Sequence, residues 1–233
     1  MPAIAVQAHR GSPDAATGLR ENTLEAFGRA RRLGASGVEI DVRMTKDGAL
    51  AIHHDPIIDG AGPVNELAAE DLPEYVPLLP AALEACDGLI VNIEIKNLPG
   101  EPGFDADEQV TRDVADLVAT MGRAEEVVIS SFWPETLVAV HDAHPDIPTG
   151  LLLAGWFDPA DAVVAAVSRG CTALHPFVTL VSPALVDEAH RAGLTVAAWT
   201  VNDRPQLEAV ARAGADTVIT DDVTFARSVL GLG

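Results

Sequence analysis

Residues 37–44 have the sequence GVEIDVRM, and this stretch favours one fold class over the others. Valine and isoleucine alternate in it with Glu39 and Asp41, and a strand of this composition has one apolar face and one face that carries both carboxylates. Seven further runs are rich in Val, Ile, Leu and Ala at both odd and even positions, which is typical of strands buried on both faces of a parallel sheet. These runs cover residues 3–9, 88–97, 126–132, 149–155, 171–177, 194–201 and 216–221.

Segments with helical periodicity separate these runs, and several begin with Pro or Asp and end with Gly. The first, NTLEAFGRARRLG at 22–34, predicts a capping box formed by Asn22 and Glu25 and a C-terminal cap at Gly34. Eight strand–helix units of about 29 residues each, close to the size of a minimal βα repeat, predict an α/β fold of the (β/α)8 TIM-barrel type. The alternative is an open doubly wound sheet, but HRGS at 9–12 is not the glycine-rich phosphate loop of that fold.

The second unit is irregular. KDGALAIHHDP at 46–56 has an Asp-Gly turn between apolar residues, which predicts a β-hairpin. Residues 56–76 contain several prolines and glycines without a clear period, so we expect a short loop insertion on the barrel rim after the second strand. The sequence thus predicts a single domain over residues 1–233.

Composition excludes several classes of protein. The formal net charge is −20, which disfavours nucleic acid and anionic membrane surfaces as partners. The chain has no apolar run of membrane-spanning length and no secretory signal at its N-terminus, so stable membrane insertion is not expected. Cys86 and Cys171 do not form a metal-binding spacing, and two cysteines cannot make a disulfide framework, which fits the reducing environment of the cytoplasm. No heptad pattern indicates a partner chain, and the oligomeric state is left open.

Charged residues interrupt two of the apolar strands. Glu39 and Asp41 share one strand face, and Glu94 shares a face with Lys96 in IEIK at 93–96. Buried carboxylates need a compensating cation. Either a hard divalent ion, Mg²⁺ or Ca²⁺, binds all three through oxygen, or Lys96 and Arg10 neutralise them in an ion-pair network.

Two histidines accompany these carboxylates. His9 and Arg10 stand at the end of the first strand, where barrels build their active sites, and His54 lies in the predicted hairpin. His53 and His54 should point to opposite faces, with His53 in solvent. His175 follows the sixth strand and is expected either to line the cleft or to have a capping or core role. A metal, two histidines, an arginine and a lysine together suit the hydrolysis of a phosphate ester.

These residues resemble the signature of the glycerophosphodiester phosphodiesterase family over nearly the whole chain. The matching elements, in order, are HRG (9–11), ENT (21–23), EID (39–41), TKDG (45–48), HD (54–55), IEIK (93–96), SSF (130–132) and WTVND (199–203). Arg20 departs from the family, which often has proline before ENT. The insertion at 56–76 looks short, which bears on the choice of substrate.

The resemblance implies a TIM barrel with a divalent metal cofactor, Mg²⁺ or Ca²⁺, and a role for each matching position. The implied acid/base pair is His9 and His54, the metal ligands are Glu39, Asp41 and Glu94, and the phosphate contacts are Arg10 and Lys96. Supporting roles fall to Glu21, to Asn22 as a helix cap, and to Asp55, which would orient His54. Phe132 and Trp199 are implied cleft residues, and Trp156 is a weaker candidate for the same wall.

The implied reaction is hydrolysis of a glycerophosphodiester to an alcohol and sn-glycerol 3-phosphate during glycerophospholipid degradation. Water and the substrate's own 2-hydroxyl group are alternative nucleophiles. One alternative function is a lysophospholipase D-like or phospholipase C-like activity on lipids. Another is a non-catalytic barrel that binds metal and phosphate, because a fold alone does not establish catalysis.

Overall fold

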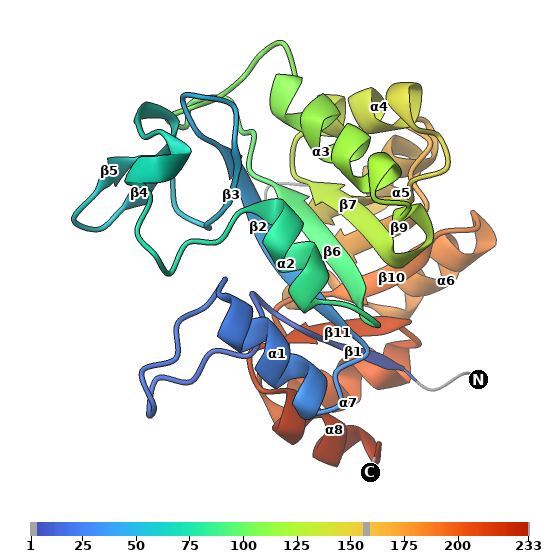
Figure 1. Cartoon of the computed structure of the whole chain (residues 1–233). Coiled ribbons are helices and arrows are strands. Elements are labelled where there is room, and N and C mark those ends of the chain that lie inside the picture. Colours follow the sequence, from blue (N-terminus) through green and yellow to red (C-terminus); the bar gives the residue numbers. More distant parts are fainter. Residues whose placement is uncertain (1–3, 156–158, 233) are drawn as a thin grey trace.

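Parallel strands close into a barrel in the computed structural model, which describes residues 4–155 and 159–232 (Figure 1). Each strand is hydrogen-bonded to its neighbours, and the pairing of β1 with β2, Gln7 opposite Gly37, closes the ring. In the described chain the barrel strands, in their order around the ring, are β1 (Ala5–Ala8), β2 (Gly37–Met44), β6 (Ile90–Ile95), β7 (Val127–Ser131), β8 (Thr149–Leu153), β9 (Ala173–Pro176), β10 (Thr195–Ala198) and β11 (Thr217–Thr220).

A helix follows each barrel strand, directly or after an excursion, and the helices surround the sheet (Figure 1). This architecture confirms the predicted (β/α)8 TIM barrel. The helices of the described chain are α1 (Leu24–Arg32), α2 (Leu79–Ala85), α3 (Gln109–Thr120), α4 (Pro134–Ala143), α5 (Pro159–Val167), α6 (Pro183–Arg191), α7 (Arg204–Ala213) and α8 (Val223–Leu230). None of the helices among the described residues has the length and apolar character of a membrane span.

Strand β2 shows how the sequence pattern places the core and the site on opposite faces. Val38, Ile40 and Val42 are fully buried in the main apolar cluster, which lies between the strands and the helices. Because side chains alternate along a strand, Glu39 and Asp41 point the other way, into the barrel. Burial of the aliphatic face, worth about 1.5–3 kcal/mol for each large side chain, therefore also fixes the direction of the two carboxylates.

The predicted cap of the first helix is wrong by one residue. Thr23 is the N-cap of α1, and its side chain accepts a hydrogen bond from the backbone N–H of Ala26 at 3.2 Å. Asn22 has a left-handed backbone, φ 54°, and its Nδ2 donates to Asp41 Oδ2 at 2.8 Å. The Asn22 side chain is thus already bonded to a carboxylate of the barrel, which leaves the adjacent threonine to cap the helix.

The predicted hairpin is present, since β3 (Leu50–Ile52) pairs antiparallel with β2. The rim insertion at 56–76 has more regular structure than the sequence predicted. It contains the two-stranded sheet of β4 (Ile57–Ile58) and β5 (Gly62–Pro63) and the 3₁₀ helices η1 (Val64–Glu66) and η2 (Ala69–Asp71), and it projects beside β3 in Figure 1. A small apolar cluster of its own supports it, formed by Ala51, Ile58, Val64 and Val76.

Candidate active site

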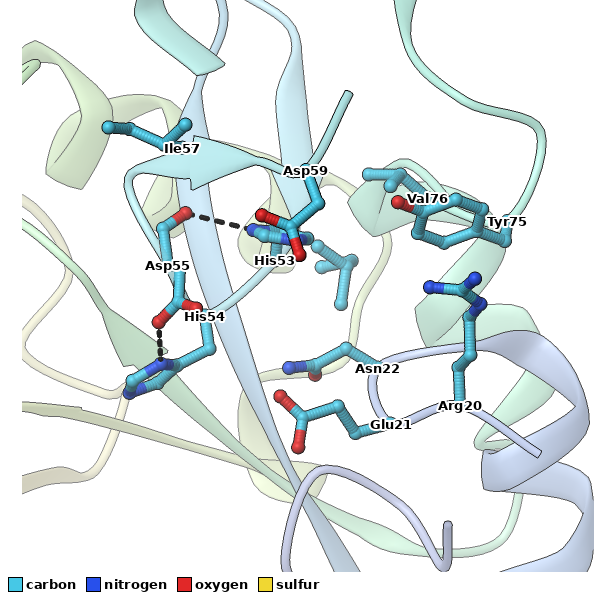
Figure 2. Close-up of a pocket in the computed structure, with 11 residues that line it drawn as sticks. Arg20, Glu21, Asn22, His53, His54, Asp55, Ile57, Asp59, Tyr75 and Val76 are labelled. Carbon is cyan, nitrogen blue, oxygen red and sulfur yellow. Dashed lines mark hydrogen bonds and ion pairs between the residues drawn. The ribbon is translucent and has the colours of Figure 1, made fainter. Parts of the chain in front are cut away.

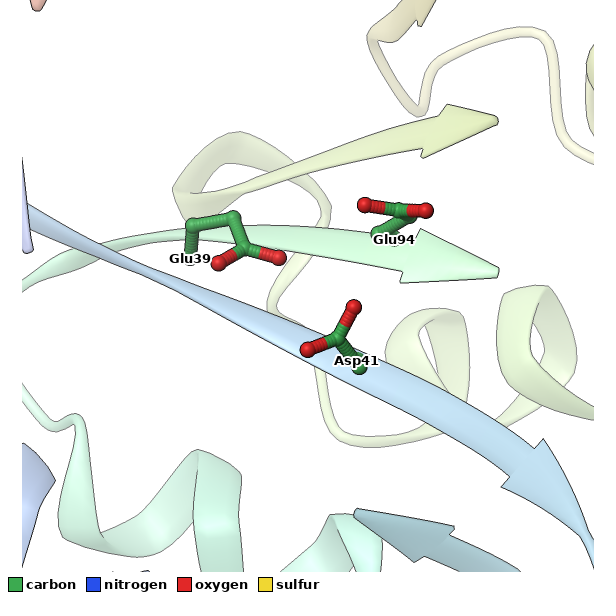
Figure 3. Close-up of side chains that lie close together, drawn as sticks. All are labelled: Glu39, Asp41 and Glu94. Atoms are coloured by element: carbon green, nitrogen blue, oxygen red, sulfur yellow. The ribbon is translucent and has the colours of Figure 1, made fainter. Parts of the chain in front are cut away.

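Three carboxylates converge on the paired strands β2 and β6. The two strands are paired in parallel with Asp41 opposite Glu94, so these side chains share one level of the barrel, and Glu39 lies two residues deeper. Figure 3 shows Glu39, Asp41 and Glu94 on the same side of the two strands. One oxygen from each carboxylate lies within 4.8 Å of the others, which is a spacing suited to a single cation.

Basic side chains contact only part of this cluster. Lys96 Nζ lies 2.6 Å from Glu94 Oε1 and 3.7 Å from Asp41 Oδ1, and Arg10 Nε lies 3.4 Å from Asp41 Oδ2. Glu39 Oε1 is buried and has no hydrogen-bond partner among the described residues. The ion-pair network proposed from the sequence therefore exists for Asp41 and Glu94, but it leaves a carboxylate oxygen of Glu39 uncompensated.

The pKa values of Glu39 and Asp41 reflect this uneven distribution of basic contacts. Burial, together with the charge of Asp41, raises the pKa of Glu39 to about 8. Burial also acts to raise the pKa of Asp41, but Lys96, His54 and Arg10 outweigh it and hold this pKa below its usual value. An oxygen-only donor set in which one buried oxygen of Glu39 has no partner among the described residues fits a hard divalent cation.

The HRG segment turns the chain sharply from β1 toward this cluster. Arg10 has a left-handed backbone, φ 51°, and its backbone N–H donates to Glu39 Oε2 at 2.9 Å. Gly11 follows with φ 83°, and a Cβ added there would lie 2.9 Å from the Cβ of Ala26 in α1, so only glycine fits. The Arg10 side chain then reaches outward, and its Nη1 donates to Glu21 Oε1 at 2.9 Å.

His9 stands at the end of β1 and is held by a residue that the sequence analysis missed. Its Nδ1 lies 2.7 Å from Oδ1 of Asp221, and Asp221 Oδ2 accepts a hydrogen bond from Asn202. Its Nε2 faces Glu39 Oε2 at 3.9 Å. Burial acts to lower the pKa of His9, but the bond to Asp221 and the charge of Glu39 outweigh burial and raise it. The sequence did contain a signal for this role, because Asp221 directly follows the last barrel strand, at the end where barrels build their active sites.

His54 and Asp55 follow β3, and His54 Nδ1 lies 2.7 Å from Asp55 Oδ1 (Figure 2). His53 is half-buried, not in solvent as predicted, and it lines one pocket together with His54. Its Nδ1 lies 2.8 Å from the Asp55 carbonyl. Strand β3 ends at Ile52, so the alternation of faces does not extend to these two residues.

A cavity of about 130 Å³ lies against the carboxylates, and we call it the inner cavity. Phe132 and Trp199 form an apolar wall with edge-to-face rings 5.5 Å apart, and Trp199 Nε1 donates to the His175 carbonyl at 2.7 Å. The residues that line the inner cavity are His9, Arg10, Glu39, His54, Asn92, Glu94, Lys96, Phe132, Leu152, Trp199 and Ile219. Trp156 lies outside the described residues.

A second pocket, of about 280 Å³, also has His54 in its lining, and we call it the outer pocket. Figure 2 shows its walls, which come from the ENT segment, the residues after β3 and the rim insertion. Arg20, which departs from the family pattern, stacks on Tyr75 of the insertion with its guanidinium carbon 4.4 Å from the ring centroid. His54 and no other described histidine lines both spaces.

His175 belongs to the barrel interior. It is 3% exposed, and burial lowers the pKa of this side chain to about 4. His175 therefore has the core role that the sequence left open, and its imidazole is neutral at physiological pH.

Comparisons with known proteins agree with this geometry. Residues 9–224 match the model of the glycerophosphoryl diester phosphodiesterase family. A glycerophosphodiester phosphodiesterase of Caldanaerobacter subterraneus is 33% identical over 93% of each chain, and one of Bacillus subtilis is 27% identical over 94% of this chain and 83% of its own.

Solved structures have the same fold. The glycerophosphodiester phosphodiesterase of Thermotoga maritima superposes with a TM-score of 0.78 at 26% identity, covering 98% of this chain and 99% of its own. An Oleispira antarctica phosphodiesterase, solved in complex with its product sn-glycerol 3-phosphate, superposes at 0.83 with 23% identity, covering 98% and 97%. The resemblance found in the sequence is thereby confirmed, and the chain belongs to the glycerophosphoryl diester phosphodiesterase family of enzymes.

Proposed function

We propose that this enzyme hydrolyses glycerophosphodiesters to an alcohol and sn-glycerol 3-phosphate, with a divalent cation bound by Glu39, Asp41 and Glu94. The observation that carries the proposal is the convergence of these carboxylates between two carboxylate-held imidazoles, those of His9 and His54. When bound, the ion supplies positive charge that polarises the phosphoryl group. Because glycerophosphodiesters are deacylated phospholipids, the reaction belongs to glycerophospholipid degradation.

In this proposal Arg10 and Lys96 bind the phosphodiester. Both line the inner cavity. Burial acts to lower the pKa of Lys96, but Glu94 and Asp41 outweigh it and raise this pKa, so the ammonium group stays charged at neutral pH. Fixed positive groups around the phosphoryl oxygens stabilise the charge that develops on them in the transition state.

The positions of the two histidines support a different role for each in the proposed reaction. The Nδ1 atoms of both rings bond to carboxylates, those of Asp221 and Asp55, so each ring presents Nε2 to the substrate. His9 lines only the inner cavity and acts as the base that removes a proton from the nucleophile. His54 stands between the two spaces, so it acts as the acid that protonates the departing alcohol, which leaves through the outer pocket.

The test is an assay of the purified chain with glycerophosphocholine. We expect release of sn-glycerol 3-phosphate and choline, loss of both products after chelation, and recovery when Mg²⁺ or Ca²⁺ is added back. Glycerol cyclic phosphate as an intermediate identifies the 2-hydroxyl as nucleophile, and incorporation of ¹⁸O from water without it identifies water. Faster turnover of lysophosphatidylcholine would favour the lipid activity, and metal binding without turnover would favour a non-catalytic barrel.

Asp221→Asn is expected to move the acidic limb of the kcat/KM pH profile to lower pH. The carboxylate of Asp221 raises the pKa of His9, so its loss lowers that pKa and leaves the base deprotonated at lower pH. The rate at the optimum should fall because the ring is less well oriented, by less than the roughly 10²- to 10⁴-fold that the histidine itself supplies. The profile of sn-glycerol 3-phosphate release measures both effects, and an unmoved acidic limb would contradict this role of Asp221.

A further inference from the structure

Asn92 is a polar residue of the inner cavity that the proposed reaction leaves without a role. It lies on β6 directly opposite Glu39 and two residues before Glu94. Its side chain therefore points to the same face as that of Glu94, and it lines the inner cavity. At about 3.3 Å per residue, it lies about 7 Å from Glu94 along the strand, on the side away from the carboxyl end.

The amide of Asn92 is buried without compensation. The residue is 1% exposed, and neither Nδ2 nor Oδ1 has a hydrogen-bond partner among the described residues. A buried amide without partners is costly and rare, so such a group in a cavity indicates that something else bonds to it. The partner has to accept from Nδ2 and donate to Oδ1, and a hydroxyl group can do both.

The rest of the cavity indicates which part of the substrate lies at this depth. Arg10 and Lys96 follow the carboxyl ends of β1 and β6, and their charges suit the phosphate of the substrate. Leu152 and Ile219 share the lining with Asn92, and both are almost fully buried. Apolar walls with one amide suit a short carbon chain that carries hydroxyl groups, whereas the basic side chains of the same lining suit the phosphate.

We propose that Asn92 is a specificity-determining residue that binds a hydroxyl group of the glycerol moiety at the floor of the inner cavity, an inference that rests on the proposed function. The enzyme then recognises two parts of its substrate, the phosphate and the glycerol moiety. Arg10 and Lys96 bind the phosphate that every diester has, and Asn92 selects diesters whose retained side is a polyol.

The experiment compares two ligands on two proteins in the presence of Mg²⁺. The ligands are sn-glycerol 3-phosphate and ethyl phosphate, which lacks the hydroxyl groups. Asn92→Leu keeps the approximate volume but removes donor and acceptor. We expect the Kd for sn-glycerol 3-phosphate, measured by calorimetry, to rise about 10-fold, as for one lost hydrogen bond, with the Kd for ethyl phosphate unchanged. In turnover, KM for glycerophosphocholine should rise more than kcat falls.

Controls separate this role from a structural one. Ser130→Ala removes a buried hydroxyl group that, like the Asn92 amide, has no hydrogen-bond partner among the described residues. Ser130 does not line the cavity, so this variant should keep the wild-type ratio of the two Kd values. Asn92→Ser is the second variant if the leucine protein fails to fold, because its shorter side chain also falls short of the ligand. Equal weakening of both ligands, or an unchanged ratio, would overturn the inference. Failure of the wild type to release sn-glycerol 3-phosphate would instead overturn the proposed function.

Discussion

His9→Ala and His54→Ala each lower kcat for release of sn-glycerol 3-phosphate by roughly 10²- to 10⁴-fold, the contribution of a well-placed proton-transfer group. The loss should appear in kcat because both rings act in the chemical step. Metal affinity should survive in both variants, since Glu39, Asp41 and Glu94 are intact. Steady-state kinetics combined with metal titration by calorimetry measure the two effects separately.

The nature of the leaving group distinguishes the two histidines. With glycerol 4-nitrophenyl phosphate, the departing nitrophenolate needs no protonation, so His54→Ala should regain most of its rate while His9→Ala stays slow. His144→Ala is the matched control, because His144 Nε2 also lies close to a carboxylate, Asp116 Oδ1 at 2.6 Å, but at the end of α4 and away from both pockets. Wild-type activity in both site variants would refute the assignment, and rescue of His9→Ala alone would reverse the two roles.

Glu39→Gln is expected to produce the second large effect, a loss of affinity for the divalent ion. At neutral pH the metal-free protein has a protonated Glu39, because burial and Asp41 raise its pKa to about 8. Glutamine resembles that protonated form, so the metal-free variant should unfold at nearly the wild-type temperature. The variant has no carboxylate to offer at this position, however, and its affinity for Mg²⁺ and Ca²⁺ should fall.

Thermal unfolding with added ion or with chelator measures this difference. An ion at 100 times its Kd stabilises the wild type by about 2.7 kcal/mol, and the gain should be much smaller in Glu39→Gln. Since the ligand must be deprotonated, the wild-type affinity should also rise with pH up to about 8. Glu208→Gln, at a half-buried carboxylate of α7 that does not line either pocket, serves as control. The same ion-induced shift in all three proteins would contradict a metal site at Glu39.

The sequence alone predicted the barrel because each barrel strand has its own local signal. Val38, Ile40 and Val42 needed only the alternation of a strand to be assigned to the buried face, and that alternation sent Glu39 and Asp41 to the other. Positions within one strand or one short motif could therefore be assigned in advance. The capping threonine and the two adjacent histidines could not, because there a tertiary contact of Asn22 or the end of β3 overrode the local pattern.

Tertiary structure decided which residues of different strands contact one another. Asp221 is more than two hundred residues from His9 in the chain, yet it holds the imidazole because β1 and β11 are neighbours where the barrel closes. The register of β2 and β6 likewise placed Glu94 opposite Asp41 and the amide of Asn92 opposite Glu39. Local sequence fixes the direction of a side chain through the geometry of its own strand, whereas partners across the barrel depend on strand order and register, which form only when the ring closes.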